Sequence, residues 1–430
     1  MNSKDLIQSL KNSELLRNTS ILVSGTAIAQ LIPILIQPIL RRYYTPDTFG
    51  AYSVYLSFVG IFAIIASFKY DLAIILPRRD KDAVNIFFLS VLISIGINIL
   101  FILIILIWDN EILKFLNLPE KFTDYLYFAP LGIFFYSFYQ SINNWLTRQK
   151  GFLPISINKF VRRGVEGATQ IGLRFVSNSK GIIYGDILGH IANVISGLWQ
   201  GRKRGLSFRL FSPVKIKYLA HKYSDFPKYN VIPSFMSACS FLLPVILLNK
   251  FYSSEMAGYF DLSKLLLSIP LALISTSISS VLLQSLSEKY RNNISLKKDI
   301  CLILGIVLSI SIFEILIITF FGIDLFKFFF GDIWGFSGRI SQILVWSYAL
   351  NFFVASFSAI FISLNKIKLL SIWQVFYFIS ILSLILFRDY QFLNFLRVYV
   401  SIEIFAYLMI ILLMIFVVLS YEKKVVSIIK

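Results

Sequence analysis

Long apolar runs alternate with short polar connections along this chain. A helix needs about 20 apolar residues to cross the hydrocarbon core of a bilayer, and the runs reach or approach that length. Hydrocarbon offers the backbone no hydrogen-bonding partner, so the runs are predicted to be helices. The pattern predicts twelve membrane-spanning helices, at residues 18–40, 50–68, 84–108, 124–146, 158–177, 182–201, 229–249, 257–286, 300–323, 338–362, 370–387 and 397–420.

A short polar segment after the first apolar run occurs a second time, 208 positions further along. Residues 42–52 read RYYTPDTFGAY and residues 250–260 read KFYSSEMAGYF, which keeps the order of cation, aromatic, tyrosine and hydroxyl. Membrane transporters are commonly built from such duplicated halves. We therefore expect an all-α integral membrane protein with two six-helix bundles, related by a pseudo-two-fold repeat, around a central cavity. The expected order is a cytoplasmic segment at 1–17, a bundle at 18–201, a basic linker at 202–228, a bundle at 229–420 and a tail at 421–430.

Composition and charge agree with a membrane protein. Hydrophobic residues make up 57% of the chain and charged residues only 15%, whereas about a quarter of a soluble chain is charged. The formal net charge is +18, which in a soluble protein would suggest nucleic acid as a partner. Here 27 of the 41 lysines and arginines lie in connections on the side of the N-terminus and nine on the other side. Both termini are therefore predicted to be cytoplasmic, and no nucleic acid is expected.

The remaining five cations lie inside the predicted spans, where charges are costly and usually functional. Three of them belong to the fifth span, in which Arg162, Glu166, Gln170 and Arg174 share one helix face, and Arg163 follows Arg162. The opposite face carries small residues, Gly164, Ala168 and Gly172. We expect the polar face to line a water-filled substrate path and the small face to pack closely on a neighbouring helix. The alternative is that Arg162 and Glu166 only neutralise each other, while Arg163 and Arg174 reach the membrane surfaces.

The other two intramembrane cations are Lys264, which could instead pair with Asp261, and Arg339, which could instead be an interfacial anchor. Arg42 and Lys250 are equivalent in the repeat and would flank the outer mouth, or be solvated loop ends. These residues complete the candidate substrate-binding set: Arg162, Arg163, Arg174, Lys264, Arg42, Lys250 and Arg339.

The sixth span carries a ladder of glycines and an acid. Gly181, Gly185, Gly189, Gly197 and Gly201 are mostly four residues apart, which predicts close packing against another helix. On the adjacent face Asp186 and His190 form a pair that is either a proton relay or a structural contact. Asp186 and Glu166 are therefore candidates for ion coupling.

Three motifs of the first half resemble a known family. Residues 25–30 contain GTAxAQ, residues 43–52 contain YYTPxxFGxY, and residues 69–77 read KYDLAIILP. Together they resemble the polysaccharide transporter family, the flippases of lipid-linked O-antigen and capsule repeat units, within the multidrug/oligosaccharidyl-lipid/polysaccharide exporter superfamily. The family motif usually has Arg-Tyr-Glu where this chain has Lys69, Tyr70 and Asp71, and Asp71 is a third coupling candidate.

This resemblance implies a flippase and not an enzyme. It implies alternating access that moves an undecaprenyl-diphosphate-linked oligosaccharide across the bacterial inner membrane. The partners it implies are this lipid-linked oligosaccharide, the membrane lipids, and glycan polymerase or assembly proteins. The chain has no phosphate-binding loop of the GxxxxGK[ST] type, so no nucleotide, other cofactor or metal is expected. The alternatives are a cation-coupled multidrug exporter of the same superfamily and a membrane glycan polymerase or ligase.

Overall fold

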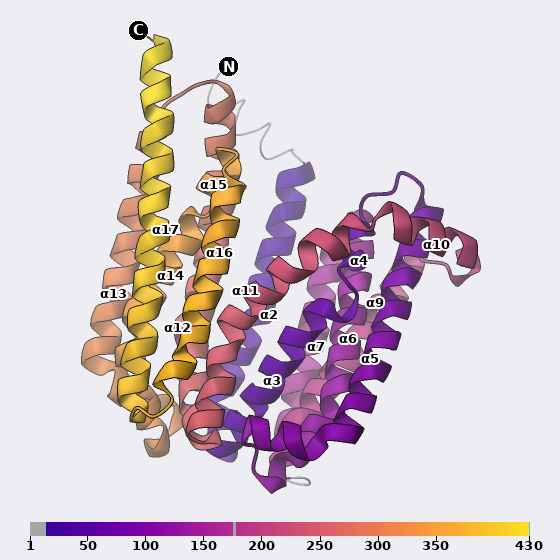
Figure 1. The fold of residues 1–430 in the computed structure, drawn as a ribbon, viewed down its shortest axis with the longest axis vertical. Coiled ribbons are helices and arrows are strands. Elements are labelled where there is room, and N and C mark those ends of the chain that lie inside the picture. Colours follow the sequence, from indigo (N-terminus) through magenta and orange to yellow (C-terminus); the bar gives the residue numbers. More distant parts are fainter. Residues whose placement is uncertain (1–13, 175–177, 430) are drawn as a thin grey trace. The chain divides into compact units, whose positions relative to one another are not determined.

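A computed structural model of the chain describes residues 14–174 and 178–429. Within these ranges the chain is almost entirely helical and contains no strand, which confirms the all-α prediction (Figure 1). Most of the predicted N-terminal segment and the last residue of the predicted tail lie outside the described residues.

Twelve long helices in the described ranges correspond one to one to the predicted spans. They are α2 (Glu14–Tyr43), α3 (Pro46–Ala66), α5 (Asp80–Leu116), α6 (Thr123–Arg148), α7 (Phe152–Gly172), α9 (Gly181–Lys203), α11 (Asp225–Phe251), α12 (Ser254–Arg291), α13 (Lys297–Phe330), α14 (Gly335–Phe357), α16 (Ile367–Leu382) and α17 (Phe392–Ile429). Shorter helices connect some of them: α4 (Tyr70–Ala73), α10 (Pro213–Lys222) and α15 (Ala359–Ser363).

By length and hydropathy, nine helices in the described part of the chain could each cross a membrane. The other three long helices, α2, α6 and α7, have 30, 26 and 21 residues, so they are also long enough. They are more polar, and all three contribute side chains to the cavity described below. The protein is therefore a multi-pass membrane protein whose least apolar helices surround polar space.

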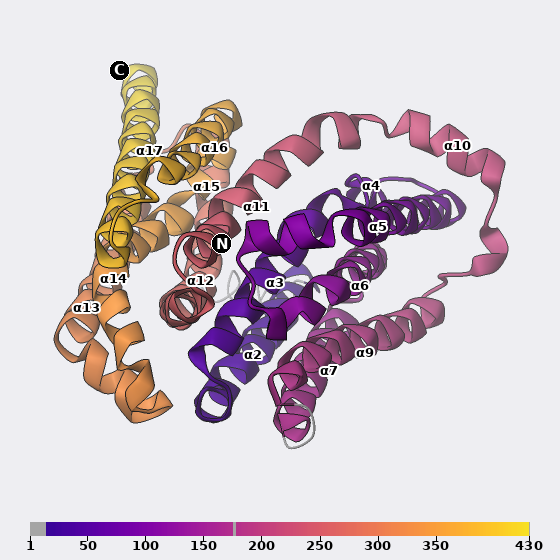
Figure 2. The same ribbon diagram turned by 60° about the horizontal axis from the view of Figure 1, so that its bottom comes forward.

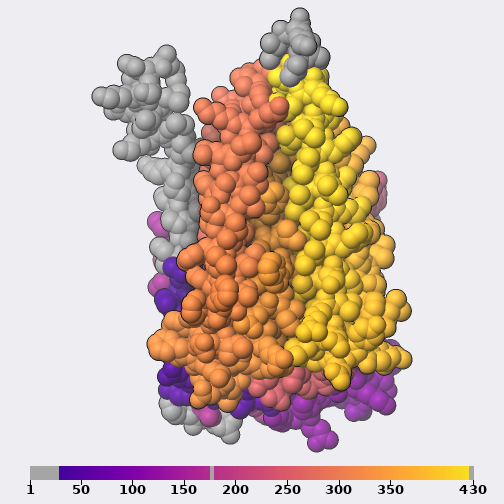
Figure 3. All heavy atoms as spheres, turned by 90° about the vertical axis from the view of Figure 1, so that its left-hand side faces the viewer, coloured from indigo at the N-terminus to yellow at the C-terminus, as the bar shows by residue number. Residues whose placement is uncertain are grey.

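The chain divides into two compact units, Met1–Ala238 and Cys239–Lys430, and the boundary falls inside α11. In unit 1, α7 packs against both α2 and α9, while α6 packs against α3, α5 and α9 (Figures 1 and 2). In unit 2, α14 packs against α12, α13 and α17, and α13 and α17 stand on one face of the unit (Figure 3). The bounds predicted for the bundles and the linker stay a prediction.

Glycines of α9 allow α9 to pack closely on α7 in unit 1. A Cβ atom added to Gly189 would lie 3.0 Å from the backbone oxygen of Arg162 and 2.9 Å from Cβ of Glu166. A Cβ atom added to Gly185 would lie 2.4 Å from Cγ of Gln170. Because no side chain larger than hydrogen fits there, α9 lies directly on α7, as the glycine ladder predicted.

The face of α7 that makes this contact is the opposite of the one expected. The polar face packs on α9, whereas nothing lies within 4 Å of a Cβ atom added to Gly164 or Gly172, so the prediction that the small face packs was wrong. Buried polar groups need hydrogen-bonding partners, and α9 supplies one, since Nε2 of Gln170 donates to the backbone oxygen of Ile182 at 3.0 Å. A lipid-facing surface would have left Gln170 without a partner.

The two glycine environments give a matched stability test. We expect Gly189→Leu to lower the free energy of unfolding by about 1–3 kcal/mol, because the added side chain pushes α9 away from α7. Gly164→Leu makes the same chemical change where nothing lies within 4 Å and should be tolerated. Unfolding in detergent micelles measures both, and an equal loss in the two variants would contradict the packing described here.

Candidate functional site

Unit 1 contains a polar cavity of about 330 Å³ between four helices. Its walls come from α2, α6, α7 and α9, which are neighbours in the packing of this unit. Among the described residues, three lysine or arginine side chains line it and no carboxylate does. The lining residues are Ala29, Gln30, Tyr136, Tyr139, Gln140, Asn143, Lys159, Arg162, Arg163, His190 and Asn193.

The three cations of the wall come from one face of α7. Lys159, Arg162 and Arg163 are spaced by three and four residues, which places their side chains on adjacent turns of the same face. Arg162 and Arg163 belong to the predicted substrate-binding set. Lys159 was missed, because it stands at the very start of the predicted span 158–177 and was counted with the connection before it, although α7 already begins at Phe152. The spacing from Lys159 to the two arginines was the signal that could have identified it.

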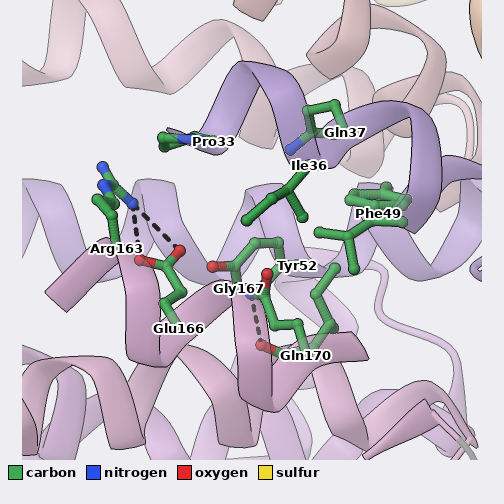
Figure 4. Close-up of a pocket in the computed structure, with 11 residues that line it drawn as sticks. Pro33, Ile36, Gln37, Phe49, Tyr52, Arg163, Glu166, Gly167 and Gln170 are labelled. Carbon is green, nitrogen blue, oxygen red and sulfur yellow. Dashed lines mark hydrogen bonds and ion pairs between the residues drawn. The ribbon is translucent and has the colours of Figure 1, made fainter. Parts of the chain in front are cut away.

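Two acids lie behind this wall and hold the arginines. Nη1 of Arg163 donates to both carboxylate oxygens of Glu166, at 3.1 and 2.8 Å (Figure 4). Nη2 of Arg162 lies 3.6 Å from Oδ1 of Asp186, and its Nε lies 3.9 Å from Oε2 of Glu166. Arg162 is therefore both an ion-pair partner and a cavity residue, which combines the two alternatives that the sequence left open.

Asp186 and His190 continue this network on α9. Nη2 of Arg162 and Nε2 of His190 are 2.9 Å apart, and the hydroxyl of Tyr55 donates to Oδ2 of Asp186 at 3.2 Å. The side chains of Asp186 and His190 are almost completely buried. Nδ1 of His190 has no hydrogen-bonding partner among the described residues. The predicted Asp186–His190 pair is thus part of a larger charged cluster that includes Arg162.

Neutral polar side chains form another part of the cavity wall. Tyr136, Tyr139, Gln140 and Asn143 follow one face of α6, and Asn193 projects from α9. Oδ1 of Asn143, Oδ1 of Asn193 and the hydroxyl of Tyr139 are buried without a hydrogen-bonding partner in the described part of the chain. These residues were missed, although their spacing on α6 was readable. They offer hydrogen bonds that the protein itself does not use.

A smaller pocket of about 40 Å³ lies on the other side of Arg163, next to α2 and α3 (Figure 4). Gln37, Tyr52, Glu166 and Gln170 contribute its polar side chains. Beside it Arg41 is only 1% exposed. Its Nε donates to Oε1 of Gln37 at 2.8 Å, and its guanidinium lies 3.5 Å from the ring centre of Phe49. The sequence singled out the adjacent Arg42, which is exposed.

The other predicted cations do not line the cavity of unit 1. Arg174 is half-buried, with its guanidinium 5.9 Å from the ring centre of Tyr44. Lys250, Lys264 and Arg339 belong to unit 2. Lys250 is half-buried and Arg339 exposed.

Lys264 is buried in unit 2. Its Nζ donates to the backbone oxygen of Phe241 at 2.5 Å and lies 3.6 Å from the ring centre of that residue. A backbone carbonyl and an aromatic face therefore accommodate its charge. The structure thus joins only Arg162 and Arg163 of the predicted substrate-binding set in one cavity.

Asp71 links the segment after α3 to α6 by hydrogen bonds. Its carboxylate accepts hydrogen bonds from Oγ of Ser67 at 2.6 Å and from Nδ2 of Asn144 at 3.1 Å. It is buried and does not line the cavity. Nearby, Nη1 of Arg148 donates to the backbone oxygens of Ile75 and Pro77. The segment 69–77 is thus fixed to α6 by hydrogen bonds at two places.

Unit 2 holds a second buried polar cluster, around Glu403 of α17. Its Oε1 accepts hydrogen bonds from the hydroxyls of Tyr399 and Tyr377, at 2.7 and 3.0 Å. The hydroxyl of Tyr407 lies 3.2 Å from that of Tyr377 and accepts a hydrogen bond from Asn351. This cluster combines residues from α14, α16 and α17, so it ties together helices that are far apart in the sequence.

Comparison with protein families identifies the chain. A family model described as "Polysaccharide biosynthesis protein" matches residues 15–289. The chain belongs to this family. The match includes the cavity of unit 1 and the three motifs of the first half, so it confirms the resemblance found in the sequence. Comparison with curated proteins gives no match.

Solved structures of transporters share the fold of this polysaccharide biosynthesis protein. An inward-facing multidrug resistance MATE family transporter of the MOP superfamily is similar with a TM-score of 0.70 and 17% identity, over 92% of this chain and 96% of the other. The lipid II flippase MurJ in an inward closed conformation gives 0.73 and 14%, over 95% and 91%. A MOP superfamily transporter from Pyrococcus furiosus, titled for the reverse polarity of its binding pocket, gives 0.59 and 16%, over 95% and 96%. These likenesses confirm the predicted membrane transporter fold.

The ion pair behind the cavity can be tested by a double-mutant cycle. We expect Glu166→Ala to lower the free energy of unfolding by about 2 kcal/mol, because it leaves the partly buried Arg163 without its carboxylate. Adding Arg163→Ala should cost little more, so the two changes are not additive. The pair of Lys215, which is exposed, and Asp82, which is half-buried, lies 3.8 Å apart at the surface. It is the control and should show a coupling energy of less than about 0.5 kcal/mol. Equal coupling in both pairs would contradict a structural role for Glu166.

Proposed function

We propose that this polysaccharide biosynthesis protein is a flippase that moves an undecaprenyl-diphosphate-linked oligosaccharide, such as an O-antigen or capsule repeat unit, across the bacterial cytoplasmic membrane by alternating access. The observation that carries this proposal is the wall of the unit 1 cavity, to which the described part of the chain contributes three cations and no carboxylate. We place both termini in the cytoplasm, from the distribution of lysine and arginine over the connections.

The cations suit the diphosphate of such a lipid. Arginine presents a planar set of donors that binds phosphate oxygens in pairs, and charge-assisted hydrogen bonds of this kind are among the strongest in proteins. Arg162 and Arg163 are adjacent in the sequence, and Lys159 lies one turn away, so two phosphate groups could be contacted together. For a diphosphate placed there, these cations would replace the hydration that the membrane interior does not supply.

The amides and tyrosines suit the sugars. Hexose hydroxyls donate and accept hydrogen bonds, and the buried oxygens of Asn143 and Asn193 have no partner among the described residues. Tyr136 and Tyr139 add aromatic surface beside them. One cavity thus combines a cationic wall for phosphate with a neutral polar wall for carbohydrate.

Glu166 and Asp186 are our candidates for ion coupling. They hold the same arginines that would bind the diphosphate, so the carboxylates and the phosphates compete for one set of donors. Protonation of either acid would release an arginine to the substrate. Asp71 stays a candidate from the family motif, although its partners are Ser67 and Asn144.

A cation-coupled multidrug exporter is the second candidate, because MATE transporters share this fold. The cavity argues against it, since like charges on the wall and on a cationic drug repel. A glycan polymerase or ligase, the third class considered, has no comparable observation in its favour.

Removing the cations tests the flippase directly. We expect Arg162→Gln/Arg163→Gln to lower transport of lipid-linked oligosaccharide into proteoliposomes at least tenfold, since a hydrogen bond to a charged group contributes about 1.5 kcal/mol or more. Lys217→Gln/Lys222→Gln removes two exposed charges of α10 and should leave transport unchanged. Normal transport by the arginine variant, at normal protein levels, would refute the cationic path, and transport of a cationic drug would favour the exporter.

The neutral wall can be tested by comparing two substrates. We expect Asn143→Ala/Asn193→Ala to raise the apparent KM for lipid-linked oligosaccharide roughly fivefold or more, because each lost neutral hydrogen bond contributes about 1 kcal/mol. The same variant should transport bare polyisoprenyl diphosphate as the wild type does. An equal effect on both substrates would show that the amides do not contact sugar.

A further inference from the structure

Unit 2 contains an apolar groove of about 240 Å³ between α13 and α17. Both helices pack against α14, which together with α15 forms the floor (Figure 3). None of the lining side chains carries a charge, hydroxyl or amide group. They are Ile300, Leu304, Phe353, Phe357, Ile360, Ile411, Met414, Ile415, Val418 and Leu419.

Both walls of the groove end in an exposed lysine at the same end of unit 2. On α13, Lys297 lies one turn before Ile300, and on α17, Lys423 lies one turn after Leu419. Residues three or four apart share a helix face, so each lysine continues the wall of the groove beyond its last apolar residue.

Hydrogen bonds bring these two lysines to one rim. The carboxylate of Glu422 accepts from the backbone nitrogen of Leu296 at 2.7 Å and from Oγ of Ser295 at 2.9 Å. Lys297 follows Leu296 and Lys423 follows Glu422 in the sequence. The hydrogen bonds therefore join residues that are adjacent to both lysines. The start of α13 and the end of α17 are therefore held together at this point.

Two acids near the rim, Glu422 and Asp299, already bind other groups of the protein. Glu422 is buried and bound to the connection before α13, as described above. Asp299 pairs with Nζ of Lys289 at 2.6 Å and accepts a further hydrogen bond from Ser285. The rim thus presents exposed positive charge above an apolar groove.

We infer that this groove binds an anionic glycerophospholipid of the surrounding leaflet, with an acyl chain between α13 and α17 and the phosphate at Lys297 and Lys423. Basic pockets between membrane helices on the cytoplasmic side are typical sites for anionic head groups, and the charge distribution predicts this end to be cytoplasmic. This inference does not rest on the proposed function.

The groove fits a phospholipid better than the transported lipid. A diphosphate oligosaccharide needs hydrogen bonds for its sugars, and the groove offers none from its lining side chains. A compact phosphate head group needs only the two cations and the membrane surface. The occupant is therefore a resident lipid of the bilayer, and its site is separate from the cavity of unit 1.

The test measures dissociation constants of phosphatidylglycerol and phosphatidylcholine with identical acyl chains, by native mass spectrometry of the full chain in a neutral detergent. We expect phosphatidylglycerol to bind more tightly. Lys297→Gln/Lys423→Gln should weaken it roughly thirtyfold, because each lysine near an anionic head group contributes about 1 kcal/mol. Lys366→Gln/Lys368→Gln, which changes two exposed lysines before and within α16, should have no effect.

The groove itself is tested by Leu304→Trp, which fills it, with Leu302→Trp on the far side of α13 as the control. We expect only Leu304→Trp to weaken binding, with both variants equally stable to heat. Equal weakening by both lysine pairs or by both tryptophans, or equal affinity for the two phospholipids, would overturn the inference. Displacement of phosphatidylglycerol by a lower concentration of polyisoprenyl diphosphate would overturn the assigned occupant.

Discussion

Charged groups can stay inside a membrane protein only if other groups compensate for their lost hydration, and this requirement governs the structure of unit 1. Arg162 and Arg163 project from a membrane helix, and each is held by an acid behind it. Leaving one member of such a pair alone in a buried site is costly. The carboxylates compensate from one side, so the other side of the guanidinium groups can border a cavity that holds water or an anion.

Helix packing follows from the same requirement. The acids Glu166 and Asp186 belong to different helices, and both must reach Arg162, which requires α7 and α9 to lie close together. Gly185 and Gly189 make that distance possible, since the backbone of α7 occupies the space where their side chains would be. The glycines of α9 therefore make the ion pairs of Arg162 possible. The small face of α7 has no packing role at Gly164 and Gly172.

The sequence predicted the fold well and the site only in part. Twelve apolar runs could be located because the bilayer sets a single length for each. The arginines of α7 stood out because charge is rare in such runs. Lys159 stands at the very start of the predicted span 158–177 and was counted with the connection before it, since hydropathy does not show that α7 already begins at Phe152. Arg42 was chosen because the repeat pairs it with Lys250. Arg41 could not be recognised from the sequence, since the rotation of α2 about its axis, which buries one of two adjacent cations, depends on packing with distant segments.

Neutral polar residues were the least predictable part of the site. Asn143 and Gln140 carry no charge, so they did not stand out among the intramembrane cations, and only the fold shows that they line one cavity with Asn193 of α9. The orientation of the α7 faces also required the structure, because it depends on which neighbour can supply hydrogen bonds. In both cases the missing information was the identity of the adjacent helix.

The cationic wall of unit 1 is proposed to bind the diphosphate of a lipid-linked oligosaccharide. An experimental structure with that lipid bound, determined in a bilayer mimic, tests it most directly. We expect phosphate oxygens about 2.7–2.9 Å from the guanidinium nitrogens of Arg162 or Arg163, with sugars beside Asn143 and Asn193. A diphosphate bound elsewhere, with Arg163 still paired to Glu166 and the cavity holding only water, would contradict it.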